Sequence, residues 1–199
     1  MVVVFEAGHG KDTPGKCSPD KSLMEWEYNR KICAELVEEL KARGITYVYT
    51  YGSEDKDLSL AERVRLVNKV CSEHGSKNVL FISIHGNAAG SGDWMSAKGW
   101  SGFVVEGART AEKCCTEMYK AFEEEFTDRS FRYYGGKSNP VWKYPFYVCK
   151  HTYCPAMLLE NFFYDNREEC EFMKRADTPK RVAKAIANGI ELCKKYYEK

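Results

Sequence analysis

Residues 79–84, Val-Leu-Phe-Ile-Ser-Ile, form a short apolar run that stops at His85 and gives way to small and polar residues. The run is rich in β-branched and aromatic residues and too short for a helix, so it predicts a central strand covered on both faces. Ligands of open α/β sheets bind beside the carboxyl ends of the strands. His85 is therefore a candidate functional residue, although a lone histidine in such a place more often only caps a loop.

Further strands and helices alternate along the chain. We expect strands at 2–6, 45–51, 102–106, 146–149 and 155–159, and helices at 23–43, 60–75, 110–126 and from 178 to the C-terminus. Capping boxes, Ser22 to Glu25 and Ser59 to Glu62, mark two of the helix starts. This order predicts an α/β fold with a largely parallel, twisted sheet of about six strands flanked by helices on both faces. Residues 1–199 contain no linker or repeat and are expected to form a single catalytic domain.

Composition excludes several classes of partner. The 30 Lys and Arg against 29 Asp and Glu give a net charge of +1, spread along the chain, so no nucleic acid partner is expected. No segment has the length of a membrane span or the form of a signal peptide, which predicts a soluble protein made in the cytoplasm. We also expect a monomer. Nine cysteines without a CxxC pair indicate free thiols, with Cys149 and Cys154 the pair to check for a disulfide.

Three predicted strands end at side chains capable of chemistry, namely His9, His85 and Glu160. The carboxyl ends of parallel strands share one edge of a sheet, so we expect the three to lie close together. Glu25 joins them, because the loop after the first strand stays at that edge until its helix begins. Two histidines and a carboxylate suit a catalytic zinc site with its fourth position open, and a second carboxylate can transfer protons.

Each of these residues has a structural alternative. Glu25 can be only the third residue of its capping box, and Glu160 can be an ordinary acid in a surface ion pair. The rival donors are Glu6, Glu27, His74 and His151. His74, beside a helix end, most simply complements the helix dipole.

Five short motifs also occur in a fixed order over nearly the whole chain. They are 7–10 (Ala-Gly-His-Gly), Glu25-x-x-x-Asn29, Leu58-Ser59-Leu60-x-x-Arg63 with Asn68, 83–88 (Ser-Ile-His-Gly-Asn-Ala), and 155–160 (Pro-Ala-Met-Leu-Leu-Glu) with Phe163 and Asn166. In this order they resemble the zinc-dependent N-acetylmuramoyl-L-alanine amidases of the type 3 class. The resemblance implies one zinc ion per chain, held by His9, Glu25 and His85, with Glu160 as the catalytic carboxylate.

The chain departs from the family pattern at two positions of note. Phe162 stands where the family usually has glycine, two places after the catalytic glutamate, and this bears on the local shape of the site. Tyr51 stands where the family usually has arginine, which bears on a structural ion pair. The compact chain without a wall-binding module looks more like the phage and prophage lysis enzymes than the cell-division members.

The activity that the resemblance implies is hydrolysis of the amide between the lactyl group of N-acetylmuramic acid and L-alanine in peptidoglycan. Glu160 would take a proton from the attacking water and return it to the departing amine. The enzyme would reach the wall after release or export by an unknown route. The expected substrate contacts are Asn87 and the loop aromatics Trp94, Trp100 and Trp142.

Two other functions are compatible with the same residues. The first is a non-catalytic peptidoglycan-binding domain with a degenerate zinc site, which the departure at Phe162 motivates. The second is a cysteine peptidase that uses Cys17 or Cys154, but neither cysteine lies in a recognisable nucleophile signature.

Overall fold

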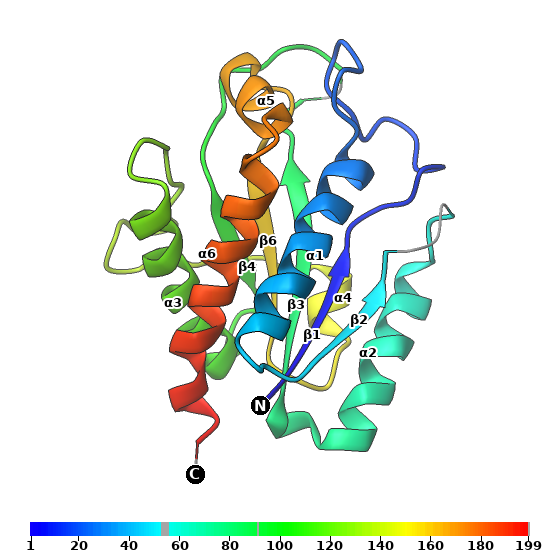
Figure 1. Ribbon diagram of the computed structural model, residues 1–199, viewed down its shortest axis with the longest axis vertical. Helices are drawn as coiled ribbons and strands as arrows, with labels where there is room; N and C mark the ends of the chain where they lie inside the picture. Colours follow the sequence, from blue (N-terminus) through cyan, green and yellow to red (C-terminus); the bar gives the residue numbers. More distant parts are fainter. Residues whose placement is uncertain (53–55, 91, 199) are drawn as a thin grey trace.

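The computed structural model describes residues 1–52, 56–90 and 92–198, which form one sheet between two layers of helices (Figure 1). The strands are β1 (Val2–Ala7), β2 (Tyr47–Tyr51), β3 (Val79–Asn87), β4 (Ser101–Val104), β5 (Trp142–Lys143) and β6 (Ala156–Phe163). The helices are α1 (Glu25–Ala42), α2 (Leu60–His74), α3 (Arg109–Glu125), α4 (Tyr147–Lys150), α5 (Arg167–Lys174) and α6 (Thr178–Cys193), with 3₁₀ turns at Ser76–Asn78 and Lys194–Tyr196. The predicted α/β class is confirmed.

The strand order in the sheet is β2-β1-β3-β6-β4-β5. The pairs β2–β1, β1–β3, β3–β6 and β4–β5 are parallel, and only β4 runs antiparallel to its neighbour β6. The apolar run that precedes His85 forms the first six residues of β3, which lies between β1 and β6. This run is buried on both faces, as its sequence predicted.

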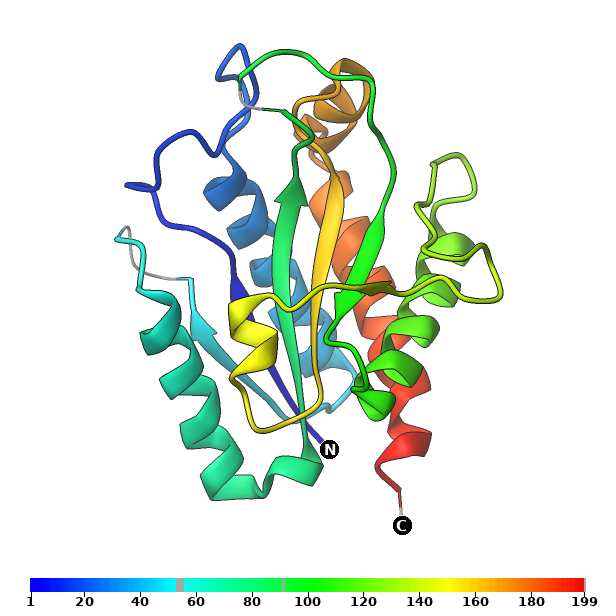
Figure 2. The same cartoon turned by 180° about the vertical axis from the view of Figure 1, so that it is seen from behind.

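The two faces of the sheet have different helical cover. One face, with Ile82 and Leu159, packs against α1, α3 and α6, and together they form the larger core. The opposite face, with Phe81 and Leu158, packs against α2 and α4. Figure 2 shows that α2 and α4 lie over the lower part of the sheet, across the amino-terminal halves of β3 and β6. The carboxyl-terminal halves of these two strands therefore have no helix across this face.

The prediction of a strand at 146–149 is wrong, because this segment begins the short helix α4. Lys150 donates its backbone N–H to the carbonyl of Phe146 at 2.9 Å, which is a helical bond. Val148 and Cys149, two consecutive residues, are both buried in the smaller core, whereas a half-buried strand would bury alternate residues. A four-residue apolar run does not distinguish the two structures.

The predicted capping box at the start of α1 is also wrong, whereas the Ser59–Glu62 box of α2 is confirmed. Helix α1 begins at Glu25 without a side-chain cap, because the preceding loop folds back on the helix start. The carbonyl of Lys16 accepts the Glu25 N–H at 2.9 Å, and Cys17 forms an antiparallel bridge with Met24. The Glu25 carboxylate therefore does not cap the helix and instead contacts β3 at Gly86.

Sequence reasoning missed helix α5, although Asn166 three residues before Glu169 is a helix-start signal. All nine cysteines are free thiols, and Cys149 and Cys154 are not bonded to each other. Among the residues that the structure describes, no helix is both long and apolar enough to cross a bilayer.

Candidate metal centre

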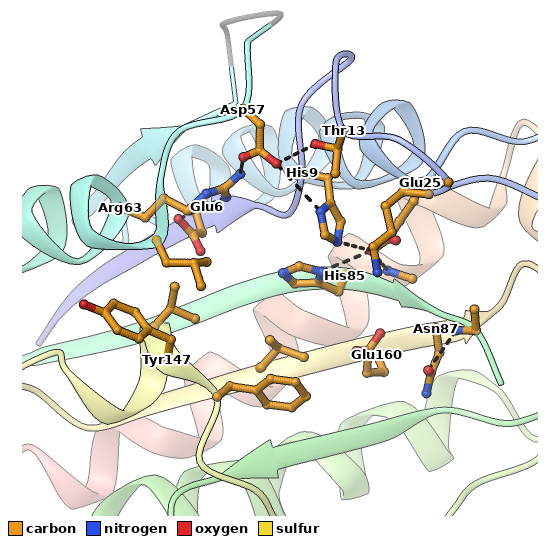
Figure 3. Close-up of a pocket in the computed structure, with 18 of the residues that line it drawn as sticks. Glu6, His9, Thr13, Glu25, Asp57, Arg63, His85, Asn87, Tyr147 and Glu160 are labelled. Carbon is orange, nitrogen blue, oxygen red and sulfur yellow. Dashed lines mark hydrogen bonds and ion pairs between the residues drawn. The ribbon is translucent and has the colours of Figure 1, made fainter. Parts of the chain in front are cut away.

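His9, Glu25 and His85 meet above the uncovered part of the sheet (Figure 3). His9 follows β1, Glu25 begins α1, and His85 lies near the end of β3. Glu25 Oε1 is 3.4 Å from His9 Nε2 and 3.1 Å from His85 Nδ1, and the two imidazole rings meet edge to face at 4.9 Å between centroids. Gly8 allows this approach, because any side chain there would overlap the His85 ring.

The geometry of these three residues fits a small divalent cation. Their potential ligand atoms all lie within 4.8 Å of one another. Ligands at about 2.0–2.2 Å from a tetrahedral zinc ion are roughly 3.2–3.6 Å apart, close to the two separations measured from Glu25 Oε1. Burial lowers the pKa of His9 to about 4, which keeps the imidazole neutral as a ligand must be.

The charge state of Glu25 also suits a ligand. Burial alone would raise the pKa of Glu25, but the hydrogen bond with His85 lowers the pKa below its usual value. The backbone N–H of Gly86 donates to the same carboxylate oxygen at 3.2 Å. Glu25 is therefore held as a carboxylate that faces both histidines.

Glu160 lies beside His85 because the two residues are register partners in the parallel pair of β3 and β6. Its Oε2 atom is shielded from solvent and has no hydrogen-bond partner within the described ranges. Burial, and then the charge of Glu25, raise the pKa of Glu160 well above its usual value. A carboxyl group in this state is suited to exchange protons with a bound substrate or water.

Glu160 does not end its strand as expected, because a β-bulge carries β6 on to Phe163. His85 pairs with Glu160 but Asn87 pairs with Phe163, so β6 has one extra residue here. Within the bulge, Phe162 has a φ of 72°, the left-handed region that favours glycine. Glycine, which the family pattern usually has here, can adopt this conformation without steric cost.

The Phe162 side chain points into the larger core and away from the site. It is fully buried and packs edge to face against Phe126 and Phe172, with ring centroids 5.4 and 5.1 Å apart. Asn161, the neighbouring residue of the bulge, donates from Nδ2 to the carbonyl of His85 at 2.9 Å. The departure from glycine is therefore accommodated without displacing Glu160 from His85.

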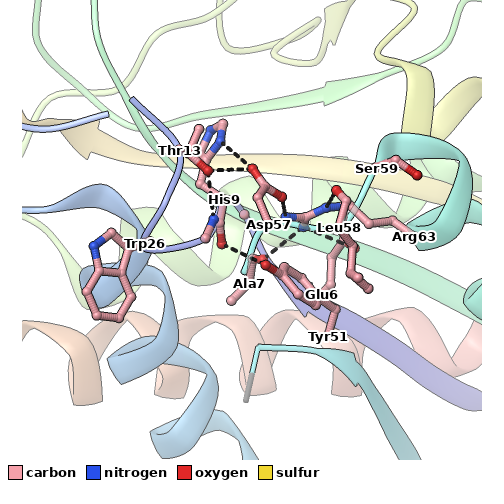
Figure 4. A network of polar contacts seen from close by, with 12 residues as sticks. Glu6, Ala7, His9, Thr13, Trp26, Tyr51, Asp57, Leu58, Ser59 and Arg63 are labelled. Carbon is pink, nitrogen blue, oxygen red and sulfur yellow. Dashed lines mark hydrogen bonds and ion pairs between the residues drawn. The ribbon is translucent and has the colours of Figure 1, made fainter. Parts of the chain in front are cut away.

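A second carboxylate, Asp57, supports His9 from the outside (Figure 4). Asp57 Oδ2 lies 3.9 Å from His9 Nδ1, the ring nitrogen opposite the one that faces Glu25. Thr13 Oγ1 donates to Asp57 Oδ2, and Arg63 Nη2 donates to Asp57 Oδ1. Since His9 has an unusual φ of 63°, contacts that hold this loop also determine where its ring points.

Arg63 connects this network to the sheet. Its guanidinium donates to the carbonyl of Ala7 at 3.0 Å and forms an ion pair with buried Glu6 at 3.4 Å. Tyr51, the residue in place of the family's usual arginine, lies under Arg63 with the guanidinium 4.0 Å from its ring centroid. Tyr51 also donates to the carbonyl of Lys56 at 2.7 Å, so it joins the network as a packing surface and a donor.

The rival ligands lie elsewhere. Glu6 is occupied by Arg63 and by the Ser83 hydroxyl, which donates to it at 2.9 Å. His74, His151 and Glu27 are all exposed. None of the four belongs to the cluster of His9, Glu25 and His85.

A cavity of about 920 Å³ surrounds the centre. Of the predicted substrate contacts, Asn87 lines it, whereas Trp94 and Trp142 are partly buried and lie outside its lining. The prediction that Trp100 contacts the substrate is wrong. Its side chain is completely buried and stacks on Phe122 at 4.2 Å between ring centroids, so it cannot touch a substrate. The loop that carries Trp100 packs it into the larger core against Tyr119 and Phe122 of α3, which the sequence alone does not reveal.

Trp100 nevertheless contributes to the site from within the core. Its Nε1 donates to Asn161 Oδ1 at 2.9 Å, and Asn161 in turn donates to the carbonyl of His85. Asp57, Lys16 and Asn161 are the site residues that sequence reasoning missed. Asn161 directly follows the glutamate of a recognised motif, whereas Asp57 and Lys16 lie in irregular loops that carry no pattern.

The sequence and fold were then compared with known proteins. The chain is 27% identical over 188 residues to the N-acetylmuramoyl-L-alanine amidase LytC of Bacillus subtilis, covering 94% of this chain and 34% of LytC. It is 26% identical over 189 residues to the endolysin of Bacillus phage SPP1, covering 95% of this chain and 64% of the endolysin. The chain thus spans about a third and about two thirds of these relatives.

Solved structures agree with the sequence comparison. The catalytic domain of CwlV, an N-acetylmuramoyl-L-alanine amidase from Bacillus (Paenibacillus) polymyxa var. colistinus, superposes with a TM-score of 0.77 at 28% identity. The superposition covers 96% of this chain and 97% of that domain. The family model described as N-acetylmuramoyl-L-alanine amidase matches residues 3–192. Because that match covers nearly the whole chain, the protein belongs to the type 3 N-acetylmuramoyl-L-alanine amidase family.

Proposed function

We propose that this chain hydrolyses the amide bond between the lactyl group of N-acetylmuramic acid and L-alanine in peptidoglycan. Family membership supports this reaction. The observation that carries the proposal is the pairing of His85 with Glu160, which sets an unligated carboxyl group beside a cluster of three metal-binding side chains. A hydrolase of this kind needs both parts within one cavity.

We propose zinc as the metal, one ion per chain, with His9, Glu25 and His85 as the residues that hold it. Two imidazoles and one carboxylate are a donor set typical of catalytic zinc, and their separations suit it. When bound there, zinc would supply a Lewis acid that polarises the scissile carbonyl and lowers the pKa of the attacking water toward neutrality.

Glu160 is proposed to move the protons of the reaction. As a carboxylate, Glu160 accepts a proton from the attacking water, and as the acid it returns that proton to the amine of L-alanine as the C–N bond breaks. Its raised pKa, caused first by burial, favours retention of the proton between these two steps. Asn87 lines the same cavity and is the proposed polar contact for the substrate.

The test is mass spectrometry of purified muropeptides after incubation with the zinc-loaded protein. Glycan strands without peptide, together with intact stem peptides, are the expected products. The variant Glu160→Gln should retain zinc and fold while its kcat falls by at least about a hundredfold, because a positioned acid or base typically contributes that much.

The matched control is Glu27→Gln, which makes the same change at an exposed residue of α1 outside the cavity and should leave kcat unchanged. Wild-type turnover in Glu160→Gln would remove Glu160 from the mechanism. Loss of zinc in that variant would instead make Glu160 a ligand. Binding of muropeptides without any hydrolysis by the wild type would favour a non-catalytic binding domain.

We further propose that the protein acts on the wall outside the compartment in which it is made. This follows from the substrate, since peptidoglycan is extracytoplasmic, and it requires release or export. A monomer is still the expected state for this reaction, because His9, Glu25, His85 and Glu160 all come from one chain.

A further inference from the structure

Lys16 is placed at the metal centre by the same fold-back that starts helix α1. Its carbonyl accepts the backbone N–H of Glu25 at 2.9 Å, and the bridge between Cys17 and Met24 holds the two segments together. The side chain of Lys16 is half-buried and lines the cavity that contains His9, Glu25 and Glu160. Its position is therefore set by backbone contacts to a proposed metal ligand.

Among the described residues that line this cavity, Lys16 has a cationic side chain without an ion pair. Arg63, the other strongly basic residue in the lining, forms ion pairs with Glu6 and Asp57. Lys16 has no ion pair within 4.0 Å among residues 1–52, 56–90 and 92–198. Its charge also acts on His9, Glu25 and Glu160, which line the same cavity.

An unpaired cation in the lining of a substrate cavity, on a backbone segment that is fixed by hydrogen bonds, is suited to bind an anion of the substrate. The N-acetylated sugars of peptidoglycan carry no charge, and the lactyl carboxyl group is consumed in the scissile amide. The charged groups of the substrate therefore belong to its stem peptide, and the first of them is the α-carboxylate of the γ-linked glutamate that follows L-alanine.

Building on the proposed amidase function, we infer that Lys16 determines specificity by binding a carboxylate of the stem peptide next to the scissile amide. The ligand class is an acidic peptide with its free carboxylate one residue beyond the departing alanine. Peptides in which this carboxylate is amidated offer a neutral carboxamide, which lacks the charge that Lys16 recognises.

Two muropeptides that differ only at this group, carboxylate or carboxamide, test the inference. The wild type should show a lower KM for the carboxylate form. In Lys16→Met, KM for the carboxylate form should rise about tenfold, the lower range for a hydrogen bond to a charged group, while KM for the carboxamide form stays unchanged. In Lys16→Met and in Lys16→Arg, kcat should stay close to that of the wild type. Lys16→Arg keeps the positive charge and should therefore preserve the lower KM for the carboxylate form.

The control Lys11→Met removes the same charge from an exposed residue of the same loop outside the cavity lining. It should leave both KM values unchanged, which separates local recognition from general electrostatic attraction. Equal losses on the two substrates in Lys16→Met, or a fall in kcat alone, would overturn the inference and assign Lys16 to the reacting centre.

Binding of the free stem dipeptides to the zinc-loaded protein, measured by calorimetry, separates this inference from the proposed function. A preference for the carboxylate dipeptide that Lys16→Met abolishes supports the inference even if no muropeptide is cleaved. Equal binding of the two dipeptides by the wild type contradicts it even if both muropeptides are hydrolysed.

Discussion

His85 on β3 and Glu160 on β6 are directly paired in parallel register, so their side chains leave the same face of the sheet side by side. This face is the one that α2 and α4 leave uncovered beyond the middle of the strands (Figure 2). His85 also contacts Glu25 at 3.1 Å, whereas Glu160 has a shielded oxygen without a hydrogen-bond partner in the described parts of the chain. One adjacent pair thus combines an imidazole of the candidate metal cluster with a carboxyl group outside that cluster.

The carboxyl group of Glu160, whose Oε2 atom has no hydrogen-bond partner among the described residues, should reduce stability at neutral pH. Burial raises its pKa in the folded protein above the unfolded value of about 4.3. Between these two pKa values the folded state binds more protons, so the free energy of unfolding falls as pH rises. We expect metal-free Glu160→Gln to be more stable than the metal-free wild type at pH 7, with the difference narrowing toward about pH 4.

Thermal unfolding in the presence of a chelator measures this difference across the pH range. Glu124→Gln, at an exposed position of α3, is the control and should show a small, pH-independent change. A wild type that is as stable as Glu160→Gln at pH 7 would contradict the prediction.

Asp57 should strengthen metal binding without being a ligand. Its carboxylate faces His9 Nδ1 at 3.9 Å, and such an outer partner orients the imidazole. We expect Asp57→Asn to weaken zinc affinity by about 10- to 100-fold, measured by competition with a chromophoric chelator. Asp12→Asn is the control, because Asp12 accepts the Asp57 backbone N–H at 2.6 Å and belongs to the same loop contact. An equal effect of both variants would assign Asp57 to loop structure alone.

The backbone conformation of Phe162 predicts an unusual order of stabilities. Removing its buried ring should cost about 3–5 kcal/mol in both Phe162→Ala and Phe162→Gly. At a φ of 72°, however, glycine avoids strain of about 1–2 kcal/mol, so the glycine variant should be the more stable of the two. Denaturant unfolding measures both free energies. At Phe163, the next residue, alanine should be more stable than glycine, as is usual in strands.

Zinc should stabilise the fold through the His9, Glu25 and His85 cluster. A ligand present at a thousand times its Kd adds about 4 kcal/mol, so the melting temperature should rise with zinc and fall again with a chelator. His85→Ala should lose most of this shift, since one of three ligands is missing. His74→Ala, at an exposed histidine, should keep the full shift. A persistent shift in His85→Ala would point to another site.

Local patterns predicted the parts of the fold that depend on neighbours in the sequence. The apolar run of β3 required burial on both faces, and the Ser59–Glu62 box placed the start of α2. His9 and His85 followed because parallel strands bring their carboxyl ends together. The burial of Trp100 could not be predicted, since it depends on the packing of its loop against Phe122 of α3.

The sequence by itself determined the class of the fold, the family, and the residue types available for a metal and for proton transfer, because these depend on periodicity and on short motifs. Only the tertiary structure decided how they meet. The register of β3 on β6 places Glu160 beside His85, and the bulge at Phe162 carries the strand on past that pair. The loop fold-back sets Lys16 against Glu25, and the loop after β2 brings Asp57 to His9. These contacts join residues that lie nine to seventy-five positions apart, and only the packed sheet brings them together.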